Sequence, residues 1–526
     1  AMEGWNVIFV WIFLLVAVYG KIASNAQYEY DETFWNLYGT SLTDTATWSA
    51  VDDAGNIYVV GSTEGTFEGV SGYGMQDIFV LKLDSTGSVN WAQILGTSAN
   101  DVPYGLYLDK KNNYLYFTGV TQGSLATTNA GNYDVFIAKY NLFGNRIWVS
   151  QFGGIRNDFA MSLTLNTQET HMLIVGHSNS PVVLSVNNTY TPLRNDSYDS
   201  SASVNSFSYD ILVAACEIQN GTISQTNLFG TQFNEFAYST FSDTASGIIV
   251  GGETNADFSL GINNTGQLSR DMLLMRVFDN GTLDWFDQMG TNTTDVIYGV
   301  TVDKLGNIFA VGVTSGDLAS NLNTGMHDVA IMKWSSNGSL AWTRLYGSTQ
   351  DDFAFSIYST NTLSVTTSKP SPSPSPLNAS SPTPSSSPVS PATVNQADLW
   401  IAGYTQGNMY NLGFYGGVSD AFVMEIDRVT GDRKSTKVIG TEGDDVANCA
   451  VTSNLFLNTT VPNPLSISIV VVGATNGDLQ GHAGQDDAFV LRFSPAEQAE
   501  SPNKEDKNYL IPSVVAAIII LAFGIA

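Results

Sequence analysis

Three kinds of short motif recur along this chain, and each kind occurs seven times. The first is an apolar run closed by Gly-x-Thr or Gly-x-Ser, found at residues 55–63, 113–121, 171–178, 247–254, 306–314, 398–405 and 468–475. Runs this short, flanked by turn residues, predict strands buried on both faces rather than helices. Repetition of this kind has to be recognised first, because it decides the fold class.

The second motif is an Asp-led apolar run, at residues 77–82, 134–139, 210–215, 271–276, 328–333, 420–425 and 487–492. The third is a glycine followed five residues later by an acid, which is Asp44, Asp101, Asp158, Glu235, Asp295, Asp352 or Asp445. A tryptophan precedes five of those glycines, namely Trp35, Trp91, Trp148, Trp285 and Trp342. Each repeat therefore predicts four strands: a after the acid, b at Gly-x-Thr, c at the Asp-led run, and d from Trp to Gly.

Seven four-stranded units with two hydrophobic faces bury those faces best when their sheets stack radially. We therefore predict an all-β fold, a seven-bladed β-propeller over residues 33–493. A linear stack would instead need terminal repeats with a polar outer face. The tryptophans on the outer strands are expected to fill the widening space between blades.

The register of the repeats also predicts how the ring closes. Residues 33–39 form a d strand without its own a, b and c strands, and the last unit ends after strand c at Phe493. The N-terminal d strand can complete blade seven, which removes two exposed sheet edges. This closure requires Trp35 to lie close to the segment around Phe489.

Residues 53–91 carry the motif D-x-GN-x-Y-x-x-G-x-T, then G-x-x-D-x-F-x-x-K and G-x-x-x-W, through Asp53, Gly55, Asn56, Tyr58, Gly61, Thr63, Asp77, Phe79, Lys82, Gly87 and Trp91. This pattern resembles the seven-bladed propeller repeat family called SBBP. The resemblance extends over residues 33–493 and implies an extracellular or cell-surface propeller. It implies no defined catalytic residues.

The net charge excludes some classes of ligand, and the positions of the cysteines exclude a disulfide. The formal net charge of −28 argues against binding nucleic acid or anionic membranes, and it leaves cations or basic partners open. The two cysteines, Cys216 and Cys449, fall in blades three and seven. Their separation exceeds the reach of a disulfide, so we predict two free, mostly buried thiols.

Both ends of the chain carry targeting features. Residues 1–26 are predicted to be a signal peptide, because residues 7–18 are apolar and Ser24 and Ala26 suit cleavage; a membrane anchor is the alternative. A polar linker, 494–508, precedes a C-terminal hydrophobic segment, 509–526. That arrangement predicts GPI attachment at Ala499 or Ser501, with a transmembrane helix as the alternative.

Two insertions and the glycosylation motifs fit a secreted protein. The insertions are residues 179–209, in the b–c loop of blade three, and residues 365–397, a Ser-Pro-rich a–b loop of blade six. Nine Asn-x-Ser/Thr motifs lie at Asn187, Asn195, Asn220, Asn263, Asn280, Asn292, Asn337, Asn378 and Asn458. We therefore expect an extracellular glycoprotein, anchored to the cell surface through its C-terminal segment.

The seven acids of the third motif are the only candidate metal ligands, with Ca²⁺ as the cation. Carboxylates in this position can equally accept backbone N–H bonds and shape each d–a connection, and that role is the one we favour. The chain has four histidines without metal-ligand spacing, and it contains no nucleophile elbow, HExxH or P-loop. We expect no catalytic residues and no cofactor.

These observations favour a non-catalytic cell-surface module that binds a glycan or a protein through the b–c loops. A structural glycoprotein of a cell coat, wall or surface appendage is the alternative. An enzyme acting on polysaccharide ranks third, because every blade offers the same acid and no carboxylate pair stands out.

Overall fold

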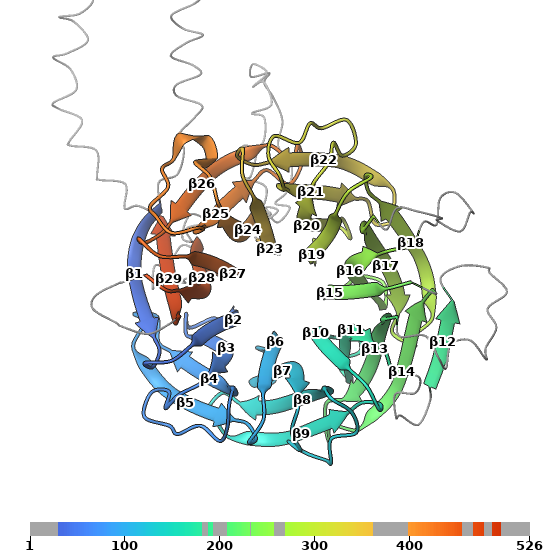
Figure 1. The fold of residues 1–526 in the computed structure, drawn as a ribbon. Helices are drawn as coiled ribbons and strands as arrows, with labels where there is room; N and C mark the ends of the chain where they lie inside the picture. The colour runs from blue at the N-terminus through green and yellow to red at the C-terminus, as the bar shows by residue number, and fades with distance from the viewer. Residues whose placement is uncertain are drawn as a thin grey trace, which may run out of the picture. The chain divides into compact units, whose positions relative to one another are not determined.

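The computed structural model describes residues 30–180, 188–192, 208–231, 233–256, 269–360, 398–454, 467–477 and 486–495. Seven sheets surround a central channel, and each sheet extends outward from it (Figure 1). Five of the sheets are antiparallel meanders from the innermost to the outermost strand in chain order, and blades three and seven depart from this order at their outermost strand. The predicted all-β, seven-bladed propeller is confirmed.

The first four blades follow one another along the chain. Blade one comprises β2 (Asp44–Val51), β3 (Ile57–Thr63), β4 (Asp77–Leu83) and β5 (Val89–Leu95). Blade two comprises β6 (Asp101–Asp109), β7 (Tyr114–Thr121), β8 (Asp134–Asn141) and β9 (Arg146–Phe152). Blade three comprises β10 (Asp158–Leu165), β11 (His171–Ser178), β13 (Asp210–Glu217), β14 (Ile223–Gly230) and β12 (Asn188–Pro192). Blade four comprises β15 (Glu235–Ser242), β16 (Gly247–Thr254), β17 (Asp271–Phe278) and β18 (Leu283–Met289).

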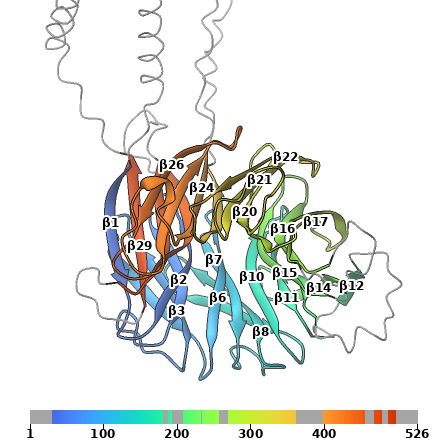
Figure 2. The same ribbon diagram turned by 45° about the horizontal axis from the view of Figure 1, so that its top comes forward.

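The remaining blades complete the ring (Figure 2). Blade five comprises β19 (Asp295–Val302), β20 (Ile308–Thr314), β21 (Asp328–Trp334) and β22 (Leu340–Tyr346). Blade six comprises β23 (Asp352–Ser359), β24 (Leu399–Thr405), β25 (Asp420–Ile426) and β26 (Arg433–Ile439), with a 3₁₀ turn at Met409–Asn411. Blade seven comprises β27 (Asp445–Asn454), β28 (Ile467–Thr475), β29 (Asp487–Pro495) and β1 (Tyr30–Tyr38).

The N-terminal strand closes the ring as predicted. Strand β1 is the outer strand of blade seven and pairs with β29 (Figure 1). The rings of Trp35 and Phe489 lie edge to face with their centroids 6.3 Å apart. The compact unit Thr33–Arg492 contains the whole propeller; the other unit, residues 1–32 and 493–526, is described only at the ends of β1 and β29.

The hydrophobic core lies between neighbouring blades rather than within one of them. Strand β3, for example, is buried at every position. One core cluster joins Ile57 and Phe79 of blade one to Val470 and Val490 of blade seven. Because each blade needs both neighbours to cover its faces, the stability of the ring depends on its closure.

Tryptophans on the outer strands dock against glycines of the next blade. The glycines have positive φ in the turn between strands c and d, where a Cβ would lie 2.9–3.1 Å from the indole; the pairs are Trp91 with Gly144, Trp148 with Gly221, Trp285 with Gly338, and Trp342 with Gly431. Trp91 also donates its indole N–H to the Leu142 carbonyl at 3.2 Å. The expected role of the tryptophans in packing between blades is thus observed.

Lysine and arginine side chains on the third strands also connect neighbouring blades, at the same end of the ring as the tryptophans. They donate to a carbonyl in the next blade's turn; the pairs are Lys82 with Leu142 (3.4 Å), Lys139 with Ile218 (2.9 Å), Lys333 with Arg428 (3.2 Å) and Arg492 with Ser85 (2.9 Å). Lys82 is one position of the repeat motif, and no role was predicted for it from the sequence. The structure shows that its ammonium group holds adjacent blades together.

Blade three differs from the prediction by one strand. Residues Asn188–Pro192, inside the predicted insertion 179–209, pair in parallel with β14 as a fifth, outermost strand, β12. The insertion was expected to be a loop. An outermost strand presents unpaired backbone groups, and β12 satisfies those of β14.

Several predicted features fall outside the described residues: the signal peptide 1–26, the Ser-Pro-rich insertion 365–397, the segment 496–526 with Ala499 and Ser501, and Asn187, Asn195, Asn263, Asn378 and Asn458. The four sequon asparagines that are described, Asn220, Asn280, Asn292 and Asn337, are all exposed. No helix among the described residues is long and apolar enough to cross a membrane.

Both thiols are free and buried, as predicted. Cys216 lies on β13 of blade three and Cys449 on β27 of blade seven, in separate core clusters. Burial raises the pKa of Cys216 to about 12 and that of Cys449 to about 11.

We expect the two thiols of the native protein to resist a thiol reagent such as DTNB at pH 8, and both thiols to react after unfolding. Fast reaction of either thiol in the folded protein would contradict this.

Ring closure can be tested at Gly87, which lies in the turn before β5 with φ +87°. A Cβ there would lie 2.7 Å from Asn36 Nδ2 and 2.9 Å from the Phe34 ring, both on β1. Gly69, with φ +79°, has no atom within 4 Å of its Cβ position, so Gly69→Ala is a matched control for backbone strain. We expect Gly87→Ala to destabilise by ~1–3 kcal/mol more than the control in chemical unfolding, because it overpacks the closure; equal effects would show that this contact contributes nothing.

Candidate functional site

The seven acids of the repeat lie at one end of the channel, where each one opens an innermost strand. We call this end, which carries the b–c and d–a connections, the acid end. Each acid is at most 1% exposed and accepts the backbone N–H of the residue four positions earlier, over 2.5–2.7 Å. A hydroxyl from the second strand adds a bond in three blades, from Ser178, Thr254 and Thr314.

A second carboxylate stands beside each of these acids across the repeat glycine. In blade one, the Asp77 carboxylate opens β4, and a Cβ added at Gly96 would lie 1.8 Å from its Oδ1 atom. Asp134 with Gly153, Asp328 with Gly347 and Asp420 with Gly440 repeat this geometry. The glycine of the repeat is therefore required because the carboxylate occupies the space of its side chain.

The seven acids accept backbone N–H groups, which is the structural role that the sequence favoured for them. Four of the second carboxylates also accept a backbone N–H, those of Asp77, Asp134, Asp328 and Asp420. Among the described residues, no group of three or more His, Cys, Asp and Glu side chains converges to hold a metal ion. Calcium binding by the seven acids stays a prediction.

Burial raises the pKa of each of the seven repeat acids, and the junction between blades three and four is the extreme case. Burial and then the neighbouring Glu235 raise the pKa of Asp210 to about 8. Burial likewise raises the pKa of Glu235 to about 7, against the hydrogen bonds from Thr231 and Thr254. The junction between blades three and four is therefore the one most sensitive to pH near neutrality.

The channel wall near the acid end is aromatic over blades three to six. We call Phe159, Phe236, Tyr238, Tyr298, Phe353 and Phe355 the aromatic wall. Every innermost strand has a bulge at its fourth residue, and in blades four to six this residue is Tyr238, Tyr298 or Phe355. Their rings contact one another from blade to blade, with centroids 5.3 and 5.5 Å apart. Blade two has Tyr104 and blade three has Met161 at the same position, so large side chains occupy the bulges of blades two to six.

Two titratable residues, Glu253 and His177, lie next to the aromatic wall and depart from the repeat. Glu253 is fully buried, pairs with Arg270, and accepts the Tyr238 hydroxyl at 3.0 Å. His177 packs between Phe159 and Phe236, with ring centroids 5.0 and 4.9 Å away. Burial lowers the pKa of His177 to about 4, so the imidazole is neutral at physiological pH.

Exposed apolar side chains are concentrated on the acid end. Of the sixteen large apolar residues exposed in the described part of the chain, ten lie on its connections, and six of those belong to blades five and six. We call these six the apolar rim: Leu322 (73% exposed), Met326 (61%), Leu412 (42%), Phe414 (37%), Tyr415 (56%) and Val418 (62%).

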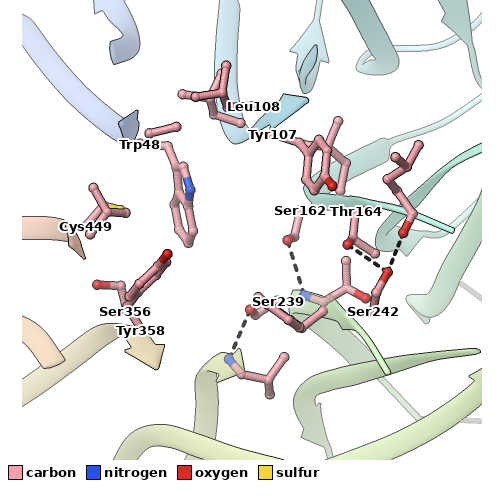
Figure 3. Close-up of a pocket in the computed structure, with 18 of the residues that line it drawn as sticks. Trp48, Tyr107, Leu108, Ser162, Thr164, Ser239, Ser242, Ser356, Tyr358 and Cys449 are labelled. Carbon is pink, nitrogen blue, oxygen red and sulfur yellow. Dashed lines mark hydrogen bonds between the residues drawn. The ribbon is translucent and has the colours of Figure 1, made fainter. Parts of the chain in front are cut away.

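A pocket of about 450 Å³ occupies the other end of the channel, where the innermost strands end (Figure 3). We call this end, with its a–b and c–d connections, the turn end. All seven innermost strands line the pocket. In six blades the lining begins at the residue following the bulge, and in blade two it begins one residue later, at Leu106. Its aromatic residues are Trp48, Tyr107, Phe241 and Tyr358. Figure 3 shows the Trp48 indole and the Tyr107 ring projecting into the pocket from blades one and two.

Sequence reasoning missed this pocket. Trp48 is not part of the d-strand tryptophan series, and the lining residues recur about once per blade without a shared residue type. The signal that was present is a break in the repeat: the residue after the bulge is Trp48 in blade one but Ser162, Ser239 and Ser356 in blades three, four and six.

Comparison with known proteins supports the repeat. Residues 284–319, from the end of blade four through β20, match the SBBP beta-propeller repeat, as the motifs had indicated. No curated protein matches the chain. Among solved structures, the Pan2 WD40 domain of Neurospora crassa is 8% identical with a TM-score of 0.42, and covers 89% of this chain and 98% of its own. Sqt1 of Chaetomium thermophilum is 11% identical with a TM-score of 0.43, covering 89% and 99%.

The Asp210–Glu235 junction predicts a pH dependence of stability. The folded pKa of Asp210, about 8, lies above its ordinary value of 3.8, so the folded state holds an extra proton between these values. Unfolding free energy must then fall as pH rises through this window. We expect the unfolding free energy of Asp210→Asn, measured by chemical unfolding, to fall less between pH 5 and pH 8 than that of the wild type.

The control is Glu442→Gln, which removes an exposed carboxyl group at the same end of the channel. An Asp210→Asn variant with the wild-type slope would show that this carboxyl is ionised in the folded protein.

Proposed function

We propose that this protein is a non-catalytic, cell-surface propeller that binds a partner through its acid end, and that the partner is a protein. The observation that carries the proposal is the apolar rim. Propellers of this architecture generally serve as scaffolds for protein interactions, and aliphatic and methionine side chains suit a protein surface better than a glycan.

The two loops that carry the apolar rim are neighbours at the acid end. The blade-five loop and the start of the blade-six loop pack on the connection 347–351, and the rest of the blade-six loop, with Tyr415 and Val418, packs on the next connection, 440–444. From blade five, Thr324 donates to the Ser348 carbonyl at 3.1 Å, and His327 pairs with Asp351 at 2.7 Å. From blade six, the Gln406 N–H donates to the Asp351 carbonyl at 2.8 Å. A partner can therefore contact both loops at once, and large contiguous apolar patches on a soluble surface typically mark interaction sites.

Sequence features support a location outside the cell. The apolar segment within residues 1–26, the sequons and the hydrophobic segment 509–526 fit secretion, glycosylation and attachment through GPI or a transmembrane helix. The four described sequon asparagines are exposed, as glycosylation requires. We propose no cofactor and no catalytic residue.

Two alternatives remain from the same features. A glycan ligand in place of a protein would need aromatic and hydroxyl groups, which the apolar rim offers only at Phe414 and Tyr415. A structural role in a coat or appendage draws on the Ser-Pro-rich segment 365–397 and the sequons. A polysaccharide-acting enzyme ranks behind both.

The apolar rim can be tested by charge insertion. The full-length protein is screened against an array of purified extracellular proteins, and each binder is re-measured with the Met326→Asp/Tyr415→Asp double variant. We expect dissociation constants to rise by roughly tenfold or more, because buried carboxylates would lose their hydration at the interface. Both side chains are more than half exposed, so the melting temperature should hardly change.

The control is Leu305→Asp/Val429→Asp, which adds the same charge at exposed apolar positions of the turn end (73% and 49% exposed). It should bind as the wild type does. Equal binding by the rim variant, or weakening by both variants alike, would contradict a docking role for the apolar rim.

A further inference from the structure

We propose that the pocket at the turn end is a second binding site, separate from the apolar rim, and that it takes a neutral saccharide: a hexopyranose or the end of an uncharged glycan. Its volume of about 450 Å³ is in the range of small-molecule sites, roughly 300–1,000 Å³. The proposal rests on the pocket's charge, its hydroxyl groups and its aromatic rings.

Charge argues against an ionic ligand. Among the residues that the structure describes, Lys110 and Glu169 are the only charged ones that line the pocket, and both lie in turns at its mouth. Lys110 is paired with Asp53 at 3.0 Å, and Glu169 is paired with Lys111. Neither side chain is available as a counter-ion, and the chain as a whole carries a formal charge of −28. An anion would be repelled by the whole protein, and a cation would find no unpaired carboxylate in the lining.

The hydroxyl groups argue against a purely apolar ligand. Three serines that follow the bulges accept a backbone N–H from the next blade: Ser162 from Thr240 at 3.2 Å, Ser239 from Val300 at 3.1 Å, and Ser356 from Ala450 at 3.0 Å. Figure 3 shows the first two of these bonds. Because each serine oxygen is an acceptor in that bond, its own O–H remains to donate. A hydrocarbon in the pocket would bury these donors without partners, which costs free energy.

The three serine bonds also make this wall rigid. Each one ties an innermost strand to its neighbour, so the hydroxyls cannot move without breaking contacts between blades. Donors held in fixed positions lose little entropy when a ligand binds. A polyhydroxylated ligand, in which every hydroxyl both donates and accepts, matches this array.

Aromatic rings supply the other half of saccharide recognition. Hexopyranoses expose patches of C–H groups on their ring faces, and such patches stack on flat aromatic surfaces. Trp48 and Tyr107 are partly exposed and project into the pocket, and Tyr358 lies beside Trp48 (Figure 3). Burial raises the pKa of Tyr107 to about 12, so its ring is an uncharged surface at physiological pH.

The test uses the full-length protein and defined probes: the methyl glycosides of glucose, galactose, mannose and N-acetylglucosamine, with trigalacturonate as an anionic probe and hexanol as an apolar probe. Binding is followed by saturation-transfer NMR and calorimetry. We expect at least one neutral glycoside to bind and both other probes to fail. Tighter binding of trigalacturonate or hexanol, or no binding of any neutral glycoside at 10–20 mM, roughly the weakest affinity such a site would have, overturns the proposal.

Variants locate the site. Trp48→Ala and Tyr107→Ala should each weaken the glycoside by roughly tenfold, the effect of losing a stacked ring. Phe143→Ala removes an aromatic ring from the same end but outside the pocket, where it is 83% exposed, and should bind like the wild type. Two pocket variants are used because Trp48 and Tyr107 pack against different core clusters, so that a variant which unfolds leaves the other one to decide.

Failure here is distinguishable from failure of the protein-binding proposal. The Met326→Asp/Tyr415→Asp variant of the acid end should keep full glycoside affinity, while the pocket variants should keep their binding to protein partners. Glycoside binding that survives both pocket variants, or that is lost in the rim variant, would place the saccharide elsewhere and overturn the assignment.

Discussion

The pairing of β1 with β29 is the interaction on which the rest of this structure depends. Every blade buries hydrophobic side chains on both faces, so every blade needs two neighbours. In an open row of seven sheets, the two terminal blades would each expose an apolar face and a sheet edge. Because the N-terminal strand belongs to the last blade, separation of the two blades would have to break backbone hydrogen bonds as well as packing contacts.

The motifs that recur in the sequence are mainly devices for joining one blade to the next. Asp77 occupies the space beside Gly96 at the acid end, while Trp91 and Lys82 both reach the turn 141–145 of the next blade at the other end. A blade is thus held to its neighbour by different interactions at the acid end and at the turn end, and the aliphatic core lies between these two ends. This explains why glycine, tryptophan and acid repeat together although they lie on different strands.

Much of this arrangement could be predicted from the sequence because it repeats. Seven occurrences of each motif reveal a periodic constraint even where single blades deviate, and the unmatched strand around Trp35 predicts the closure. Strand β12 could not be predicted, since residues 188–192 have no counterpart in the other blades. The pocket was equally hidden, because its lining residues are distant in sequence and meet only when seven strands converge on one axis.

The positions that break the repeat are therefore the informative ones. A residue needed for the architecture is needed in every blade, whereas a ligand of ordinary size touches the ring unevenly. At the position after the bulge, four blades supply Trp48, Ser162, Ser239 and Ser356, while blades two and five have glycine and blade seven has Cys449. The glycines leave space, the serines leave donors, and the indole provides a flat surface. The same innermost strand thus maintains the propeller through its symmetric positions and shapes a binding pocket through its asymmetric ones.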